Sequence, residues 1–210
     1  MAHRFLDIAA TPSVKAAQAA NGSDRIWSEP KTYRAYDRFT AAEVAFIAER
    51  DSFYMATVSE TGWPYVQHRG GPPGFLRVMN ATTLAFADFR GNKQYITLGN
   101  AAANDRGALF LVDYPNRRRL KIYVRIEVKD LEPALAATLV LPGYRAKAER
   151  AFVLHLEAFD WNCSQHITPR FAEPEIDVAL MPVRARIAQL EAENRMLRNR
   201  LNIAEGETIA

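Results

Sequence analysis

Three clusters of residues have types and spacing that could do chemistry, and the first spans residues 67–75, QHRGGPPGF. Gln67, His68 and Arg69 lie at the end of an expected strand, and Gly70 opens a loop rich in glycine and proline. A guanidinium can bind a phosphate through paired hydrogen bonds, and glycines let the backbone approach a flat ligand closely. The segment therefore indicates a site for a planar or phosphorylated ligand, with a wide hairpin turn as the alternative.

The second cluster, DFRGNKQ at residues 88–94, follows an expected strand and opens a short helix. Arg90, Asn92 and Lys93 stand beside the N-terminus of that helix. Free N–H groups and the helix dipole favour phosphate at such an end, and cationic side chains add charged hydrogen bonds. The segment predicts a phosphate site, and a solvated basic turn is the alternative.

The third cluster is WNCSQH at residues 161–166, followed by Arg170. The indole of Trp161 could stack on a ring system, and Asn162, Gln165 and His166 could bond to its heteroatoms. A single histidine in such a stretch more often makes structural hydrogen bonds than acts as a catalyst.

Several classes of enzyme lack the residues that they would need. The chain has no GxSxG elbow, Walker loop or GxGxxG segment, so hydrolase, nucleotide triphosphatase and Rossmann dinucleotide-binding functions are not expected. A metal site is not expected either, because the histidines lack ligand spacing; they are His3, His68, His155 and His166. The single cysteine, Cys163, lacks a pattern that would activate a thiolate.

Composition places the chain among ordinary globular proteins. Hydrophobic residues make up 49% and the net charge is +3, which does not by itself imply a nucleic-acid partner. One cysteine permits no intramolecular disulfide, which favours a reducing compartment. No apolar run approaches the roughly 20 residues of a membrane span, and the N-terminus does not resemble a signal peptide. We therefore expect a cytoplasmic protein without a membrane partner.

Helix signals flank the middle of the chain. Residues 1–39 are expected to form a helical arm, in which Thr11 and Pro12 start a helix and Gly22 ends it. Thr40 and Glu43 form a capping box, and that second helix should run to about residue 50. Helix is expected again after residue 131, including a helical period over residues 144–159 with Ala148, Phe152, His155 and Phe159 on one side.

The middle of the chain alternates short apolar runs with turns. The expected strands cover residues 53–59, 63–69, 75–79, 83–87, 108–113 and 120–129. The first two form a hairpin, and Pro64 suggests an edge position for the second of them. Short strands at this spacing predict a small antiparallel barrel with flanking helices.

The last segment repeats apolar residues with a heptad period. Ile187, Asn194 and Leu201 occupy a positions, and Leu190 and Leu197 occupy d positions. An asparagine at an a position favours a parallel two-stranded coiled coil, because two such side chains can bond to each other. The alternative is an amphipathic helix packed on its own barrel.

The segments quoted above, together with ALFLVDYPNRRRLKIYVRIEV at residues 108–128, resemble the pyridoxamine 5′-phosphate oxidase-like FMN-binding split-barrel family. The resemblance covers roughly residues 40–171. It implies a mainly β fold with flanking helices and a split barrel over residues 40–175. It also implies a homodimer with two FMN sites at the subunit interface. The heptad pattern separately predicts a C-terminal amphipathic helix over residues 176–210.

The resemblance assigns roles to individual residues. Arg69 matches an arginine that contacts the FMN phosphate or ribityl chain, and Asn92 and Lys93 match a phosphate-binding pair. Trp161 and Arg170 resemble residues that approach the isoalloxazine, although their spacing differs by one residue. The expected cofactor-binding set is Gln67, His68, Arg69, Gly70, Phe86, Ala87, Asp88, Arg90, Asn92, Lys93, Gln94, Trp161 and Gln165, with Gln165 and His166 supplied by the partner subunit.

The chain also departs from the biosynthetic oxidase of that family. The substrate-binding Arg-x-His arrangement is missing, and residues 166–170 read HITPR instead. Oxidation of pyridoxamine phosphate is therefore not expected.

The leading hypothesis for the function is an FMN-dependent oxidoreductase acting on an unknown small molecule, with His166 and Arg170 as catalytic candidates. A non-catalytic flavin-binding or sensing module is the alternative. A nucleic-acid-binding role of the basic C-terminal helix is weakened by the interleaved Glu191 and Glu193.

Overall fold

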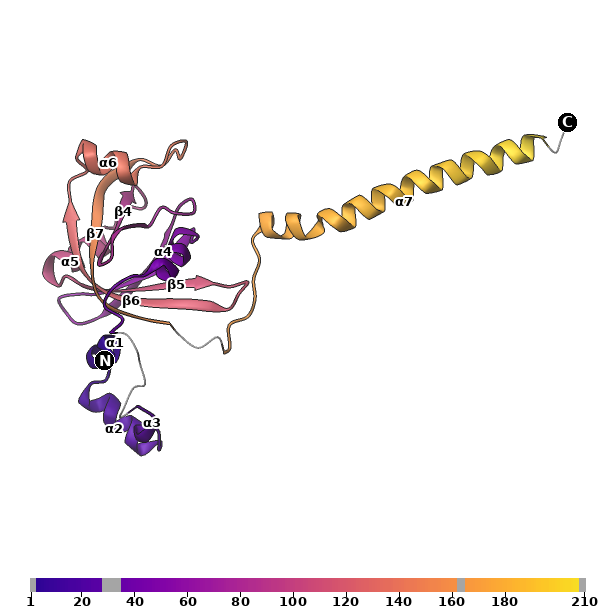
Figure 1. The fold of residues 1–210 in the computed structure, drawn as a ribbon. Helices are drawn as coiled ribbons and strands as arrows, with labels where there is room; N and C mark the ends of the chain where they lie inside the picture. Colours follow the sequence, from indigo (N-terminus) through magenta and orange to yellow (C-terminus); the bar gives the residue numbers. More distant parts are fainter. Residues whose placement is uncertain (1–2, 28–34, 162–164, 208–210) are drawn as a thin grey trace. The chain divides into compact units, whose positions relative to one another are not determined.

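The computed structural model describes residues 3–27, 35–161 and 165–207 of the chain (Figure 1). The chain forms two compact units, Met1–Ile167 and Thr168–Ala210, and each is described by itself below.

The first unit begins with a helical arm made of α1 (Arg4–Ala9), α2 (Pro12–Ala20) and α3 (Asp24–Trp27). The Thr11 hydroxyl accepts a hydrogen bond from the N–H of Val14, with Pro12 in the first helical turn, so the predicted helix start is confirmed. Phe5 of α1 is buried and stacks on Tyr123, with ring centres 4.5 Å apart. Helix α1 is therefore anchored on the sheet.

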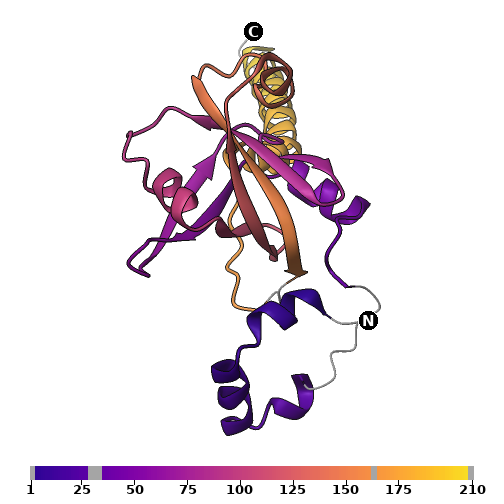
Figure 2. The ribbon, with the colours of Figure 1, turned by 90° about the vertical axis from the view of Figure 1, so that its left-hand side faces the viewer.

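Seven strands form one antiparallel sheet that curls around the core (Figure 2). They are β1 (Ser52–Val58), β2 (Pro64–Gly70), β3 (Arg77–Asn80), β4 (Thr83–Phe89), β5 (Arg106–Asp113), β6 (Arg118–Lys129) and β7 (Ala148–Trp161). Their order is β2-β1-β5-β6-β7-β4-β3, with β2 and β3 at the edges. The predicted fold, a split barrel with flanking helices, is confirmed, as is the edge position of the strand that begins at Pro64.

The core is built from alternate residues of these strands, as the period of two requires. Leu109 and Leu111 of β5 and Leu120 and Ile122 of β6 are almost fully buried. Helix α4 (Ala41–Ala48) packs Phe46 and Ile47 against the same core. Its N-terminus has the expected capping box, in which Glu43 accepts hydrogen bonds from the backbone N–H and hydroxyl of Thr40 at 2.9 and 2.7 Å.

The helix expected over residues 144–159 is wrong, because most of that segment is strand β7. β7 pairs with β6 on one side and with β4 on the other. Four consecutive residues, 151–154, are buried, so a central strand covered on both faces lacks clean alternation. A register shift opposite Tyr123 and Val124 then changes the phase of the buried residues. Together these features place apolar residues at spacings of three and four that imitate a helix.

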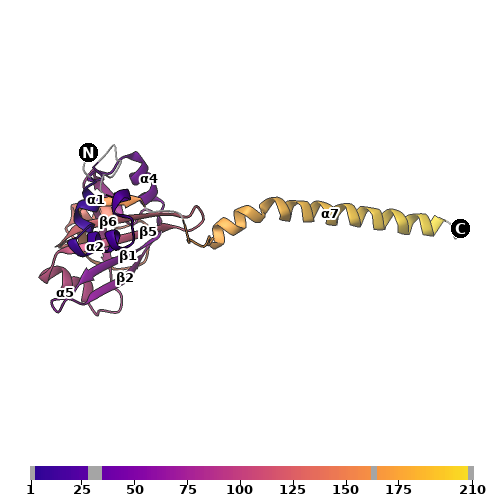
Figure 3. The same cartoon turned by 90° about the horizontal axis from the view of Figure 1, so that it is seen from below.

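Two short helices complete the first unit. Helix α5 (Ile96–Ala103) follows the loop after β4, as predicted, and lies against β1 (Figure 3). Helix α6 (Pro133–Leu139) confirms the return to helix after residue 131 and packs Leu139 in a small second core with Ala85, Ala87 and Ala151.

The second unit is dominated by one helix, α7 (Glu173–Glu207), which is 35 residues long and contains Pro182. Its apolar side chains are largely exposed in the single chain. Across the described part of the chain, no helix has the length and apolar character needed to cross a bilayer.

Candidate functional site

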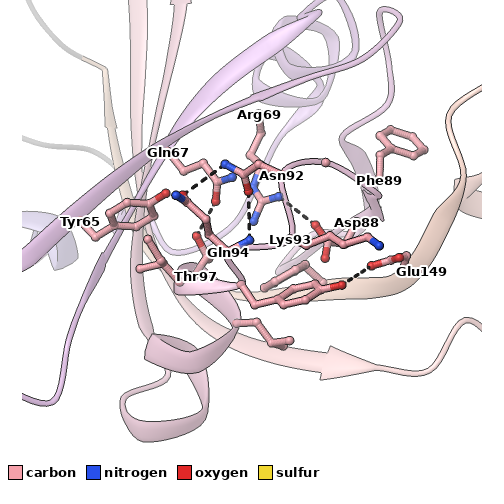
Figure 4. A pocket seen from close by; sticks show the side chains of 15 residues that line it. Tyr65, Gln67, Arg69, Asp88, Phe89, Asn92, Lys93, Gln94, Thr97 and Glu149 are labelled. Carbon is pink, nitrogen blue, oxygen red and sulfur yellow. Dashed lines mark hydrogen bonds and ion pairs between the residues drawn. The ribbon is translucent and has the colours of Figure 1, made fainter.

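A polar pocket of about 170 Å³ lies where β2, β4, α5 and β7 meet (Figure 4). Its walls are formed by Tyr65, Gln67 and Arg69 of β2, Asp88 and Phe89 of β4, the loop residues Gly91, Asn92, Lys93, Gln94 and Tyr95, the first turn of α5 at Ile96, Thr97 and Leu98, and Glu149 and Phe152 of β7. The first two clusters predicted from the sequence therefore meet in one place.

Strand β2 sends alternate side chains to the pocket. Tyr65, Gln67 and Arg69 are half-buried there, while the residues between them are exposed. His68 consequently lies on the opposite face, where its ring meets that of Tyr54 edge-on at 5.6 Å. Gly70 ends the strand and does not line the pocket either.

Asp88 holds two arginines at the base of the pocket. Its carboxylate accepts a hydrogen bond from Arg69 at 2.8 Å and one from Arg150 at 3.0 Å. Asp88 is 8% exposed, so the pair with Arg69 is shielded from water and is stronger than a surface ion pair. Figure 4 shows Arg69 and Asp88 facing each other across the strands.

Glu149 joins a second set of donors to this network. Its carboxylate accepts hydrogen bonds from Arg90 at 2.6 Å, from Arg150 at 3.3 Å and from the Tyr95 hydroxyl at 3.3 Å. The bond from Arg90 is the main cause that lowers the pKa of Glu149 below its usual value, partly opposed by desolvation. The charges of Arg90 and Arg150 act in the same direction as that bond, so Glu149 stays ionised at neutral pH.

The pocket, together with the ion-pair network around it, carries excess positive charge. Three arginines, Arg69, Arg90 and Arg150, share two carboxylates, Asp88 and Glu149, which leaves the network at +1. Lys93 also lines the pocket, which brings the total to +2, and it forms no ion pair with another described residue. The pocket is therefore suited to an anion.

Arg69 has a hydrogen-bonding capacity that the chain does not fill. Its Nε is buried and has no hydrogen-bond partner among the described residues. The guanidinium is fixed over the rings of Phe86 and Phe152, with its central carbon 5.6 and 5.3 Å from the ring centres. A buried donor without a partner costs about 1–3 kcal/mol. Arg77 and Arg119 also have a buried Nε without a partner among the described residues, but Arg69 is the one of the three that lines the pocket, where a bound anion could lie beside its guanidinium.

The loop before α5 adopts an unusual backbone conformation. Lys93 and Tyr95 have φ values of 60° and 54°, in the left-handed region that costs a non-glycine residue on the order of 1 kcal/mol. The Asn92 side chain supports the loop by accepting a hydrogen bond from the N–H of Gln94 at 3.1 Å and donating one to its side chain at 3.2 Å. Such strain is retained where surrounding contacts impose it, often at binding sites.

This loop leads into α5, whose N-terminus lies at the pocket. Within the described chain, the N-cap residue Tyr95 gives the first turn no side-chain hydrogen bond. The first N–H groups of a helix lack intrahelical acceptors, and here the first turn lines the pocket. Thr97 donates to the Gln67 side chain at 2.7 Å, and Asn100 donates to Thr57 at 3.0 Å, which fixes the helix on β1 and β2.

Other predicted site residues support the pocket without lining it. Phe86 packs beneath Arg69 and stacks on Phe152 at 5.2 Å, and Ala87 belongs to the small second core. Arg90 acts through its ion pair with Glu149.

The third predicted cluster lies outside the pocket. Trp161 donates to Glu43 of α4 at 2.7 Å, meets Phe46 edge-on and carries the Arg118 guanidinium over its ring. Gln165 and His166 have exposed side chains and are not among the residues that line the pocket. Arg170, also exposed, belongs to the second unit, and Asn162 and Cys163 lie outside the described residues.

Sequence reasoning missed several residues of the site, above all Glu149 and Arg150. Both stand at the start of β7, within the segment that the sequence predicts as a helix, and a helix there would not pair with β4. The adjacent charges before the apolar run AFVLHL were the available signal. Tyr65, Tyr95 and Thr97 were also missed. In the part of the chain that the structure describes, no group of three or more His, Cys, Asp or Glu could hold a metal ion.

Comparison with solved structures finds similar chains of low sequence identity. An FMN-binding protein from Syntrophomonas wolfei is 14% identical, with 72% of this chain and 95% of that chain covered and a TM-score of 0.45. HupZ from Group A Streptococcus is 14% identical, with 63% and 100% covered and a TM-score of 0.46. A Clostridium acetobutylicum protein related to general stress protein 26, of the pyridoxinephosphate oxidase family, is 15% identical, with 64% and 94% covered and a TM-score of 0.43.

A match to a family model identifies the family of this chain. No curated protein matches the chain. The family model described as pyridoxamine 5′-phosphate oxidase matches residues 39–154, which is more than half of the 210 residues and includes the whole pocket. The chain therefore belongs to the pyridoxamine 5′-phosphate oxidase family.

Proposed function

We propose that this protein is an FMN-binding flavoprotein whose pocket holds the phosphate of the cofactor. The observation that carries the proposal is the buried Arg69 Nε, which has no partner among the described residues. It belongs to a pocket that, with its ion-pair network, has two positive charges in excess. Arg69, Lys93 and the first turn of α5 would hold the phosphate.

The donor set fits a phosphate better than it fits a neutral ligand. A phosphate monoester carries nearly two negative charges at neutral pH, which matches the charge excess of the pocket and its ion-pair network. Arginine and lysine donate charged hydrogen bonds, and a helix N-terminus adds backbone donors and a favourable dipole. Asp88 and Glu149 do not oppose this binding, because Arg69 and Arg90 each pair with one of them and Arg150 pairs with both.

The size of the pocket bears on how the rest of FMN would lie. Its volume of about 170 Å³ is smaller than the roughly 300–1,000 Å³ of sites that enclose a drug-sized ligand. One chain can therefore enclose the phosphate and part of the ribityl chain, while the ring needs a further surface. This supports a homodimer with FMN at the subunit interface, as the family resemblance implies.

The isoalloxazine ring, when bound, supplies the redox chemistry, and this chain binds and orients it. We propose an oxidoreductase acting on a small molecule that the structure does not identify. His166 and Arg170 stay the candidates for the substrate side, since both are exposed. A non-catalytic flavin carrier is the alternative, because neither candidate lines the pocket in a single chain.

The proposal is tested by removing the cationic groups of the pocket. The purified protein should be yellow, and Arg69→Ala should weaken FMN binding about 10- to 100-fold, because a charged hydrogen bond contributes about 1.5–3 kcal/mol. Lys93→Ala should weaken it further. The measurement is a fluorescence-quenching titration with FMN, together with the absorbance of the protein as purified.

Arg125→Ala is a matched control. Arg125 also bonds to two carboxylates, those of Asp105 and Glu157, but lies on β6 outside the pocket, so FMN binding should stay unchanged. Full FMN occupancy in the Arg69→Ala/Lys93→Ala double variant would rule the site out. Stopped-flow reduction with NADH or NADPH, followed by oxygen, then separates an oxidoreductase from a carrier that does not turn over.

A further inference from the structure

Helix α7 carries an apolar seam that is longer than the segment recognised from the sequence. The seam begins at Ile176, steps alternately by four and three residues, and ends at Leu201. Its only polar member is Asn194. The apolar members are 39% to 64% exposed in the single chain. A continuous exposed apolar stripe along a helix marks an interaction surface.

The period of the seam indicates that its partner is another helix. Steps of four and three average 3.5 residues, whereas a straight helix has 3.6 residues per turn and drifts about 20° per heptad from such a repeat. The seam keeps its period from Ile176 to Leu201, over more than three heptads. Two helices that supercoil around each other keep such a seam in contact, while a sheet or barrel surface does not require it.

Pro182 lies in α7 but does not interrupt the seam. It occupies a c position, on the outer face, one residue before the seam residue Val183. Proline removes one backbone hydrogen bond and bends a helix locally. The part of the seam after Pro182, from Val183 to Leu201, is free of proline and glycine and is the better part for pairing.

Charges beside the seam select a second copy of the same helix in parallel orientation. Arg186 and Glu193 occupy g positions, and Glu191 and Arg198 occupy e positions. In a parallel pair in register, each g residue faces the e residue five positions further along the other helix. Arg186 then faces Glu191 of the partner subunit, and Glu193 faces Arg198 of the partner subunit, so both contacts join opposite charges.

Asn194 excludes the antiparallel alternative. In a parallel pair in register, its side chain meets the Asn194 side chain of the other copy, and each amide satisfies the other. In an antiparallel pair, a positions face d positions, which here are occupied by apolar residues such as Leu190 and Leu197. The amide would then be buried without a partner, at a cost.

We propose that the α7 helices of two copies of this chain form a parallel, in-register two-stranded coiled coil. The coil is a dimerisation element in its own right. It keeps two copies of the barrel at a high effective concentration, whatever the intrinsic affinity of the barrels for each other. The inference depends on α7 alone and not on the cofactor.

Disulfide trapping in the full-length protein tests both pairing and orientation. In a Cys163→Ser background, Asn194→Cys places one thiol per chain at an a position, where the two chains approach within disulfide range in a parallel coil. Oxidised glutathione should convert most of the protein to a covalent dimer of twice the 23.6 kDa chain mass. Arg195→Cys, on the outer face one residue later, is the matched control and should stay largely monomeric on a non-reducing gel.

A charge-reversal series then tests the register. Glu191→Arg in the Asn194→Cys protein should lower the equilibrium disulfide yield several-fold, because two arginines would face each other. Adding Arg186→Glu should restore the yield. Equal trapping of the Asn194→Cys and Arg195→Cys proteins, or no trapping of either, would overturn the proposal. FMN absorbance measured on the same samples reports the pocket separately, so failure of the coil and failure of the cofactor site are distinguishable.

Discussion

The barrel and helix α7 differ in the kind of group that they leave without a partner: a polar group in the barrel and apolar groups in the helix. The barrel closes an apolar core within one chain, as at Leu109 and Leu111, but the Nε of Arg69 has no partner among the described residues in a cationic pocket. Helix α7 leaves its apolar seam exposed, as at Leu190 and Leu197. The comparison teaches that the two units need different partners: an anionic ligand for the barrel and an apolar surface for the helix.

The largest expected effect comes from truncating one leucine in each unit. Leu109→Ala should lower the free energy of unfolding of the barrel by about 2–5 kcal/mol, because it leaves a cavity in a closed core. Leu190→Ala should leave the barrel transition in place and should instead reduce pairing of α7. All three tryptophans, Trp27, Trp63 and Trp161, precede α7, so their fluorescence in urea follows the first unit.

Pairing of α7 is measured by disulfide trapping, with Asn194→Cys added to the Leu109→Ala and Leu190→Ala proteins. The distinction between the units would fail if Leu190→Ala shifted the tryptophan transition as far as Leu109→Ala does. It would also fail if Leu109→Ala, under conditions where the barrel is still folded, abolished trapping.

A smaller effect is expected at Trp161, whose indole N–H has its hydrogen-bond acceptor, Glu43, within the same chain. Glu43 is buried and accepts the indole N–H at 2.7 Å, so Trp161→Phe removes one donor from a buried carboxylate. The free energy of unfolding should fall by about 1–3 kcal/mol, measured in urea. FMN affinity should be unchanged if Trp161 serves Glu43 alone. A parallel loss of FMN would instead support the role at the ring that the family resemblance implies.

The sequence predicted those parts of the fold that depend on local chemistry. The capping box of Thr40 and Glu43 and the hairpin of β1 and β2 are set by residues close in the chain, and both are confirmed. The loop that carries Asn92 and Lys93 to a helix start was predicted for the same reason. Two segments far apart in sequence could be joined into one pocket because each had its own phosphate-binding signal.

The sequence did not predict the parts that depend on distant pairing. β7 lies between β6 and β4, so its apolar run reflects two covered faces and a register shift rather than a helical face. Because β7 was not predicted, neither Glu149 and Arg150 nor the network that neutralises Asp88 could be predicted. Strand alternation alone separates Arg69 from His68, but which of the two faces of β2 reaches the pocket required the sheet.

The smallest expected effect concerns pH and the Glu149 carboxylate. Its pKa is lower in the folded protein than in the unfolded chain, first because Arg90 donates to it and then because of the charges of Arg90 and Arg150. Stabilisation from a lowered carboxyl pKa is fully present above the unfolded value, near 4.5, and is lost as pH falls through the lower folded value. The folded protein should therefore lose this contribution only in acid.

Glu149→Gln isolates that contribution. The difference in the free energy of unfolding between the natural chain and the variant should be constant from pH 7 to about 5.5 and should shrink as pH falls below about 4.5. Urea titrations at each pH measure it, and Glu60→Gln, in an exposed turn, is the control. A difference that stays the same into acid would show that the arginines do not hold Glu149 ionised. The charge excess assigned to the pocket would then have to be recounted, since one of its two carboxylates would be protonated.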